Sequence, residues 1–406
     1  MNCLVVGSSF SSAATVKALL KFKNIKITVV SGGTKNNLGK KKIFLVSRFF
    51  SKYSNVIGSS LKFDNVIVKK KDNFLSYNAP GGLSNIWGKV MNANPEHNKK
   101  KKMLAAIYEI KKLCSYNEEI NPIENKTLKI CNLNKNNFKP LIYLKKFNKK
   151  KKINLILKKN VTCIRKEKGL FIVDIDNKTL KKKFDKIYIA TGIFSALRIL
   201  INFMTSKYLM KKIFINHYDM IYGIIFIKDS TIIKKIMKTE KIFLNKSFAG
   251  RLILLNKKKL RKFNLKFYQE LFIKLMMFFN YKILSLNLFY KRGLKKTYVI
   301  IDNNKIIVNA VNSSLNKKII SSFKVSLSNL FKLKFFSSIF IKTRCGSDFH
   351  YSTNLAKFII LDNNIKYLLK NLYFVGMSSI KKNYFFPTFQ MMVDTYLKVF
   401  ATLKKT

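Results

Sequence analysis

Acidic residues are scarce in this chain of 406 residues. Nineteen Asp and Glu stand against 80 Lys and Arg, which gives a net charge of +61 at pH 7. Cysteine is also rare: the five residues Cys3, Cys114, Cys131, Cys163 and Cys345 form no Cys-x-x-Cys pair and no zinc-like spacing. This pattern excludes a disulfide-rich secreted scaffold and a zinc ribbon. We interpret the cysteines as reduced and structural, and we expect no metal site.

Long hydrophobic runs are missing as well. The nearest candidate for a membrane span, Leu271–Phe289, is interrupted by Lys274 and Lys282, so no spanning helix is expected. The same run fits a buried helix or a segment on a membrane surface, and burial is the more frequent outcome. Because Met1–Ala18 lacks a basic region and leads into a strand-like segment, we expect no signal peptide. These patterns predict a cytoplasmic protein and leave open a peripheral contact with the inner face of the membrane.

The lysine excess permits binding to nucleic acid, anionic lipid or another polyanion. However, the lysine runs at 40–42, 69–71, 99–102 and 149–152 are scattered between apolar segments rather than gathered on one helix. No RNA-binding aromatic motif, zinc finger or helix-turn-helix pattern accompanies them. We therefore interpret the charge as compositional and do not expect nucleic acid as a partner, while a basic surface-binding protein remains an alternative.

The N-terminus has the pattern of a strand–helix–strand unit. Hydrophobic residues make up 48% of the chain, enough for a large core and for two domains or one elaborated unit. We expect a strand over Cys3–Val6, a helix over Ala13–Phe22 and a second strand over Ile25–Val30. In the Gly-x-Gly-x-x-Gly dinucleotide fingerprint the three glycine places hold Gly7, Ser9 and Ser12, and the acidic place after the second strand holds Ser31. A Rossmann-like unit with phosphate at the helix N-terminus is predicted.

Two further turns of small residues follow. The stretch Ala79–Asn92 reads APGGLSNIWGKVMN, a tight loop with Trp87 as its packing anchor. A strand, a small-residue turn and a helix follow one another in Ile187–Leu197, which suits a backbone that lies close to a cofactor. Between about 217 and 338 apolar strands alternate with a lysine-rich helical stretch, and we expect a separate module there.

Five separated segments together resemble the glucose–methanol–choline (GMC) oxidoreductases, and especially the flavin-dependent relatives of surface-polysaccharide biosynthesis. In chain order they are Val5–Thr15 (VVGSSFSSAAT), Gly81–Gly88 (GGLSNIWG), Lys186–Leu200 (KIYIATGIFSALRIL), Gly346–Thr353 (GSDFHYST), and Asn371–Ser379 with Phe386–Val393 (NLYFVGMSS, FPTFQMMV). The order and spacing of all five agree with the family pattern, and residues 204–340 are the main part left uncovered.

The resemblance implies an α/β fold with a Rossmann-like FAD-binding domain built from residues 1–215 and 341–406, and an α+β substrate domain inserted at 216–340. Noncovalent FAD is expected, because Ile86 stands where some relatives carry a histidine that links the flavin. The positions that match the family's cofactor site are Gly7, Ser9 and Ser12 at the pyrophosphate, Gly82, Ser84 and Asn85 near the flavin, Ala190 and Gly192 along the dinucleotide, and Gly376 and Ser378 near the ribityl chain or pyrophosphate.

The resemblance also implies a catalytic base. His350 matches the family's active-site histidine, and a neutral imidazole suits removal of a hydroxyl proton while a hydride passes to flavin. Phe386 stands where the family has a second His or Asn. His217 fits either a structural role or the border of a substrate pocket. We expect an FAD-dependent oxidoreductase that acts on a CH–OH group of a sugar or other alcohol and passes electrons to an unidentified acceptor. The alternatives are a catalytically impaired relative with weak or no flavin binding, and a basic protein that binds polyanions or membrane surfaces.

Overall fold

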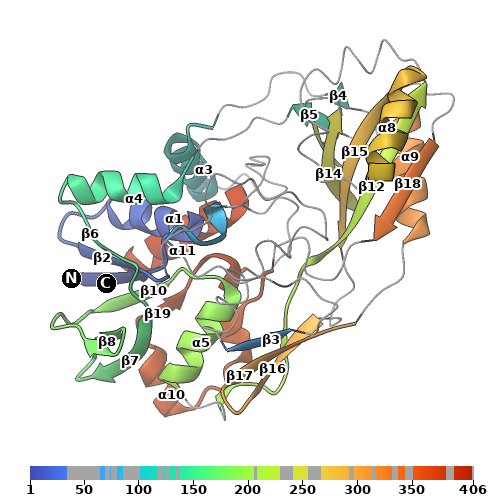
Figure 1. The fold of residues 1–406 in the computed structure, drawn as a ribbon. Coiled ribbons are helices and arrows are strands. Elements are labelled where there is room, and N and C mark those ends of the chain that lie inside the picture. Colours follow the sequence, from blue (N-terminus) through green and yellow to red (C-terminus); the bar gives the residue numbers. More distant parts are fainter. Residues whose placement is uncertain are drawn as a thin grey trace.

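The computed structural model of the chain describes residues 1–33, 65–68, 74, 80–85, 101–116, 123–124, 129–132, 138–204, 208–228, 241–254, 267–291, 297–311, 316–331, 337–342, 351–380 and 388–404. In Figure 1 a parallel sheet with flanking helices occupies one side of the molecule and a larger antiparallel sheet the other. No helix in the described segments is both long and apolar enough to cross a membrane.

The parallel sheet gathers strands from the start, the middle and the end of the chain. Its order is β19 (Leu372–Phe374), β10 (Lys186–Ile189), β1 (Asn2–Val6), β2 (Lys26–Ser31) and β6 (Asn154–Leu157), and all neighbours run parallel. The central strands are buried on both faces, as their runs of Val, Ile and Leu require. The carboxyl ends of β1, β2 and β10 therefore meet at one edge of the sheet.

Helices cover one face of this sheet. They are α1 (Phe10–Leu19), α3 (Lys101–Cys114), α4 (Pro140–Lys149) and α11 (Thr388–Lys404). Cys3, Val5 and Val29 point into this layer. Small side chains such as Ala13 and Ala14 let α1 lie close to the sheet, and nearly all of its residues are buried. The C-terminal helix α11 packs on α1, and Tyr188 of β10 hydrogen-bonds Thr402 at 2.9 Å.

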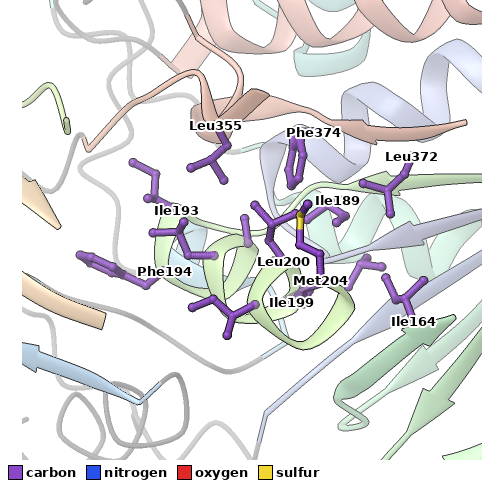
Figure 2. Close-up of a cluster of buried hydrophobic side chains, with 14 of the residues drawn as sticks. Ile164, Ile189, Ile193, Phe194, Ile199, Leu200, Met204, Leu355, Leu372 and Phe374 are labelled. Atoms are coloured by element: carbon purple, nitrogen blue, oxygen red, sulfur yellow. The ribbon is translucent and has the colours of Figure 1, made fainter. Parts of the chain in front are cut away.

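The opposite face carries α5 (Ile193–Phe203), α10 (Asn363–Leu369) and the small antiparallel sheet β7 (Val161–Glu167), β8 (Leu170–Ile175) and β9 (Lys178–Thr179). Figure 2 shows this core, with Ile193, Ile199 and Leu200 of α5 beside Ile189, Leu372 and Phe374. A four-stranded sheet in the order β11 (Ile213–Phe214), β16 (Thr297–Asp302), β17 (Lys305–Ala310) and β3 (Val66–Val68) adds Val299, Ile306 and Val308 to the same cluster.

The large antiparallel sheet has seven strands. Its order is β18 (Ser337–Lys342), β12 (Tyr218–Lys228), β15 (Tyr281–Lys291), β14 (Phe248–Leu254), β13 (Lys241–Leu244), β5 (Lys129–Asn132) and β4 (Ile123–Glu124). Helix α9 (Lys317–Phe331) packs on the face that carries Ile225 and Leu286, and α8 (Phe267–Phe278) packs on the opposite face, against Phe226 and Ile283. Strands β4 and β5 belong to this sheet although they precede residue 216 in the chain. The domain boundaries at residues 215 and 340 stay a prediction.

Glu109 ties α3 to α1. Its carboxylate lies 2.9 Å from Lys17 Nζ and also pairs with Lys21. Burial alone would raise the pKa of Glu109, but the hydrogen bonds from Lys21 and Lys17 outweigh it, so the pKa lies below its usual value. A carboxyl group with a depressed pKa in the folded state stabilises the fold above the ordinary Glu pKa, and this stability is lost as the pH falls through the folded-state pKa.

We expect Glu109→Gln to lower the free energy of unfolding at pH 7 by about 1 kcal/mol, the scale of a partly exposed ion pair. The difference from the parent should shrink as the pH falls below about 4.3, the ordinary Glu pKa. Urea unfolding at several pH values measures it, with Glu167→Gln as the control because Glu167 is exposed. An equal loss for both variants would contradict the role of this ion pair.

Candidate functional site

The turn after β1 lies at the centre of the parallel sheet and requires glycine. Gly7 has φ +121°, and its N–H donates to Val30 O at 2.7 Å. A Cβ at this position would lie 2.7 Å from the carbonyl oxygen of Ala190. That contact is with backbone, which cannot rotate away, so the close approach of the first turn to the end of β10 depends on Gly7.

The other two fingerprint positions lie on α1. Ser9 is the N-cap residue, in extended conformation, and its side chain makes no capping hydrogen bond. Ser12 is fully buried, and its Oγ has no hydrogen-bond partner within the described part of the chain. The first backbone N–H groups of a helix have no partner inside the helix, so this N-terminus offers donors and a positive dipole end to an anion.

Three residues join the first turn, the end of β2 and the glycine loop. Ser8 Oγ lies 2.5 Å from Ser31 Oγ and accepts the N–H of Gly81 at 2.6 Å. Both serines are buried. Ser31 occupies the place where dinucleotide folds carry an acidic residue for the ribose, yet its hydroxyl bonds to Ser8. Ser8 thus holds the loop at Gly81 against the first turn, and Ser31 supports Ser8 from the end of β2.

The glycine loop itself forms a 3₁₀ turn, η2 (Gly82–Asn85). Gly82 has φ +52°, and Ser84 donates to Gly81 O from both its Oγ, at 2.5 Å, and its N–H, at 3.2 Å. The backbone of Asn85 closes this turn, and its side chain lies outside the described part. The bond from Gly81 to Ser8 places this loop beside the first turn, and its role near the cofactor stays a prediction.

Two predicted positions lie where β10 leads into α5. Ala190 is buried and its N–H donates to Val6 O at 2.9 Å, which extends the pairing of β10 with β1. Gly192 is the N-cap of α5, with φ −65°, and a Cβ there would meet nothing within 4 Å. Between them, the buried Thr191 Oγ1 has no partner among the described residues. The N-terminus of α5 is therefore open and lined with donors.

The C-terminal turn packs on the start of α1. Gly376, in η5 (Gly376–Ser378), has φ +71°, and a Cβ there would lie 2.0 Å from Ser11 Oγ. Its N–H donates to Thr395 Oγ1 at 3.1 Å. Ser378 is fully buried and donates to Val375 O at 3.0 Å. The last part of the chain thus completes the region that the first turn begins.

A cleft of about 260 Å³ opens at the carboxyl edge of the parallel sheet. Its lining comes from the ends of β1, β2 and β10, the start of β7, the turn after β8, and α5: Val6, Gly7, Gly32, Asn160, Val161, Thr162, Asn177, Thr191, Ser195, Arg198, Ile199 and Asn202. Arg198 is the one charged residue in this lining, and its guanidinium donates to Asn304 O at 3.4 Å. Seven of the twelve lining residues have polar side chains, and none of the lining residues that the structure describes carries a carboxylate.

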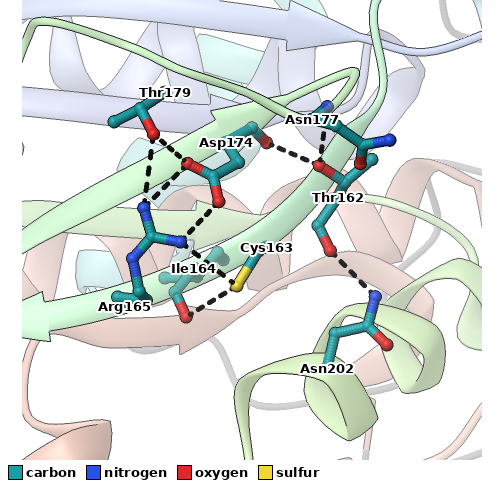
Figure 3. Close-up of polar contacts among 8 residues, drawn as sticks. All are labelled: Thr162, Cys163, Ile164, Arg165, Asp174, Asn177, Thr179 and Asn202. Carbon is teal, nitrogen blue, oxygen red and sulfur yellow. Dashed lines mark hydrogen bonds and ion pairs between the residues drawn. The ribbon is translucent and has the colours of Figure 1, made fainter.

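Hydrogen bonds hold the outer wall of this cleft. Asn202 donates to Thr162 O at 2.8 Å, and Asn177 N–H donates to Thr162 Oγ1 at 3.3 Å, as Figure 3 shows. Arg165 and Asp174 form a two-pronged ion pair at 2.5 and 2.9 Å on the neighbouring strands. This pairing, together with Thr179, holds the pKa of Asp174 below its usual value. The β7–β8 hairpin therefore presents a preformed wall.

No sequence motif indicates this wall. Asn160, Thr162 and Asn202 belong to no motif and meet only through the fold, whereas Arg198 lies in the segment 186–200 that carries the resemblance. His217 is buried, with Nε2 2.8 Å from Thr297 Oγ1 and Nδ1 3.0 Å from Tyr218 O. Both ring nitrogens are thus engaged, which fits the structural alternative. The predicted positions His350, Ile86 and Phe386 lie outside the described residues.

The donor set fits a dinucleotide. The N-terminus of α5, a backbone turn kept free of side chain at Gly7, the buried hydroxyl of Thr191 and the guanidinium of Arg198 line the cleft and favour an anionic diphosphate. The N-terminus of α1, with the unpartnered hydroxyl of Ser12, lies next to Gly7. The absence of carboxylate from the described cleft lining removes the main source of repulsion. The fold is a Rossmann-like parallel-sheet domain combined with an antiparallel sheet domain.

Solved flavoenzymes share this architecture. No protein-family model matches the chain, and no curated protein sequence matches it. Pyridoxine 4-oxidase from Mesorbium loti is similar over 100% of this chain and 99% of its own, with a TM-score of 0.53 and 9% identity. A formate oxidase variant from Aspergillus oryzae, solved for its effect on FAD modification, is similar over 99% and 98%, with a TM-score of 0.54 and 9% identity. Both are GMC flavoenzymes, and the predicted fold class, a Rossmann-like FAD domain with a substrate domain, is confirmed.

Proposed function

We propose that this protein is an FAD-dependent oxidoreductase that oxidises a CH–OH group of a small alcohol. The observation that carries the proposal is the convergence of three distant segments on one edge of the parallel sheet. The turn at Gly7, the open N-terminus of α5 at Gly192 and the C-terminal turn at Gly376 all lie there. The structural likeness to pyridoxine 4-oxidase and formate oxidase supports a flavin as the ligand.

The residues around the cleft have separate parts to play in holding the cofactor. The N-termini of α1 and α5 would take the diphosphate, because both offer free backbone donors. Arg198 and Asn160 would hold the adenosine side of the cleft. The loop at Gly82 would lie near the flavin, and the turn at Gly376 near the ribityl chain or pyrophosphate. The attachment would be noncovalent, because Ile86 stands where some relatives carry a linking histidine. Bound FAD would supply a hydride acceptor.

The chain supplies the proton acceptor. We assign this role to His350, the one histidine that matches the family pattern, since His217 is fully engaged by Thr297 and Tyr218. Its task is to take the hydroxyl proton as the carbinol hydrogen leaves. A sugar or related polyol is the substrate class that the resemblance to the polysaccharide relatives favours.

Anaerobic titration of the flavin-loaded protein with a panel of alcohols tests the activity. We expect at least one sugar or polyol to bleach the flavin absorbance, and the bleaching to reverse when an electron acceptor is added. A second candidate, a relative that keeps the fold without catalysis, is favoured by the loss of the ribose-binding carboxylate at Ser31. A panel of sugars, polyols and primary alcohols that leaves the flavin fully oxidised would support that second candidate.

Arg198→Gln should weaken FAD binding about tenfold, the scale of one charge-assisted hydrogen bond to phosphate. The side chain is half-buried and, in the described part of the chain, donates only to Asn304 O, so the fold should persist. The dissociation constant should also depend less on salt than that of the parent. Isothermal titration with FAD measures both, and Lys152→Gln, at an exposed lysine, is the control. Equal dissociation constants for the parent and Arg198→Gln would remove Arg198 from the site.

A further inference from the structure

The antiparallel sheet carries a helix that is apolar on both sides. Ile273, Met276 and Met277 of α8 pack on the sheet against Phe226 and Ile283. The outer side presents Leu271, Leu275, Phe278 and the following Phe279, which are 56%, 50%, 82% and 56% exposed, whereas the ring of Phe272 packs against Phe226. We call Leu271, Leu275, Phe278 and Phe279 the outer face of α8.

The spacing makes this a continuous surface. Leu271, Leu275 and Phe278 follow one another at helical intervals of four and three, so they form one stripe along the helix. Phe278 and Phe279 also contact each other, with ring centroids 5.6 Å apart. Single exposed apolar side chains are common on protein surfaces, but contiguous patches of large ones are not. Such a patch therefore indicates a binding surface.

Lysines lie near the C-terminal end of α8 in the structure, and further basic residues precede the helix in the sequence. Lys228 and Lys282 lie at the strand ends that meet the turn after α8, since Lys228 pairs with Tyr281 and Lys282 with Ile227. In the sequence, residues 255–266 directly precede α8 and carry six Lys or Arg and no Asp or Glu. Apolar side chains framed by lysine are typical of helices that lie in the interface of an anionic bilayer.

The net charge of the chain distinguishes between possible binding partners of the outer face of α8. A second copy of this chain would bring +61 against +61, which opposes self-association. The occupant has to be anionic at its surface and apolar just beneath it. Anionic lipid meets both conditions, and α8 lies at the end of the molecule remote from the parallel sheet, where a flat surface can reach it (Figure 1).

We propose that the outer face of α8 docks this protein on the surface of an anionic membrane. The aromatic and leucine side chains insert among the acyl chains near the headgroups, and the neighbouring lysines bind the lipid phosphates. No helix in the described segments can span the bilayer, so the contact is peripheral. This inference is independent of the flavin and of the reaction.

Vesicle co-sedimentation of the full chain tests the proposal. The parent should bind vesicles of phosphatidylcholine with 30% phosphatidylglycerol and should bind pure phosphatidylcholine much less. Leu275→Ser/Phe278→Ser/Phe279→Ser should lower the partition coefficient at least tenfold, because each buried aromatic contributes strongly to insertion. These side chains are half or more exposed, so thermal unfolding should be unchanged. The matched control is Ile360→Ser/Leu361→Ser, two residues 49% and 53% exposed on another part of the fold.

Two outcomes would overturn the proposal. Equal binding by the parent and the triple variant would mean that lysines alone hold the protein on lipid. A parent that is dimeric by light scattering, with a monomeric triple variant, would make the outer face a contact between two copies.

Discussion

Gly7→Ala is expected to lower the free energy of unfolding by about 2–4 kcal/mol and to abolish FAD retention. Two costs combine at this position. The backbone has φ +121°, where L side chains are strained, and the new Cβ would lie 2.7 Å from Ala190 O. Relief would require β1 and β10 to separate, and the cleft forms at the ends of these strands.

Gly192→Ala provides the matched control for stability. Its φ is −65° and a Cβ there would meet nothing within 4 Å, so the stability should change by less than about 1 kcal/mol. Urea unfolding followed by circular dichroism measures stability, and the visible absorbance of the purified protein measures bound flavin. If Gly7→Ala unfolds at the same urea concentration as the parent and keeps its flavin, the account of the first turn is wrong.

His350→Ala is expected to slow flavin reduction by about 10²–10⁴-fold, the usual contribution of a positioned acid–base group. Flavin content and unfolding should match the parent, because the cofactor contacts proposed here come from other segments. Stopped-flow reduction under anaerobic conditions, with the alcohol found active, measures the effect. His97→Ala is the control, since His97 lies in a lysine-rich polar stretch.

Phe386→Asn is the companion variant, because it restores the second hydrogen-bonding side chain of the family pattern. If the parent is inactive and this variant gains activity, the chain is a relative that lost its chemistry at that position. Full-speed reduction by His350→Ala would instead make the histidine structural and would reopen the choice of base.

Local patterns predicted the N-terminal unit well. The strands β1 and β2 and the turn at Gly7 were expected from apolar runs and small residues. The helix between them begins at Phe10 rather than Ala13, because Ser9 is its N-cap and the small residues that read as a turn form its first turn. Boundaries set by a single cap are weakly marked in sequence.

Long-range pairing left no local signal. The pairing of β19 with β10 was not predicted, since three apolar residues at Leu372–Phe374 carry no information on their partner. The family resemblance assigned residues 341–406 only to the same domain as residues 1–215. The strands β4 and β5, of two and four residues, were not predicted as part of the large sheet for the same reason. Register and partner choice in sheets depend on residues far apart in the chain.

The candidate site was predicted in part. The glycine positions came from the family resemblance, and the structure shows a close approach that requires glycine at Gly7 and at Gly376, which lies beside Ser11. The polar wall of Asn160, Thr162 and Asn202 was not, because these side chains meet only after the β7–β8 hairpin docks on α5. The hydrogen bond between Ser31 and Ser8 was not predicted either. The sequence shows that a serine replaces the usual acidic residue, but it does not show which group the serine hydroxyl contacts.

The visible absorption spectrum of the purified protein, followed by acid precipitation, shows whether the chain holds a flavin and how the flavin is attached. We expect a yellow protein with one FAD per chain, and release of all flavin into the supernatant, because Ile86 offers no covalent link. A colourless protein that takes up no added FAD would contradict the assignment of a flavin site to the carboxyl edge of the parallel sheet.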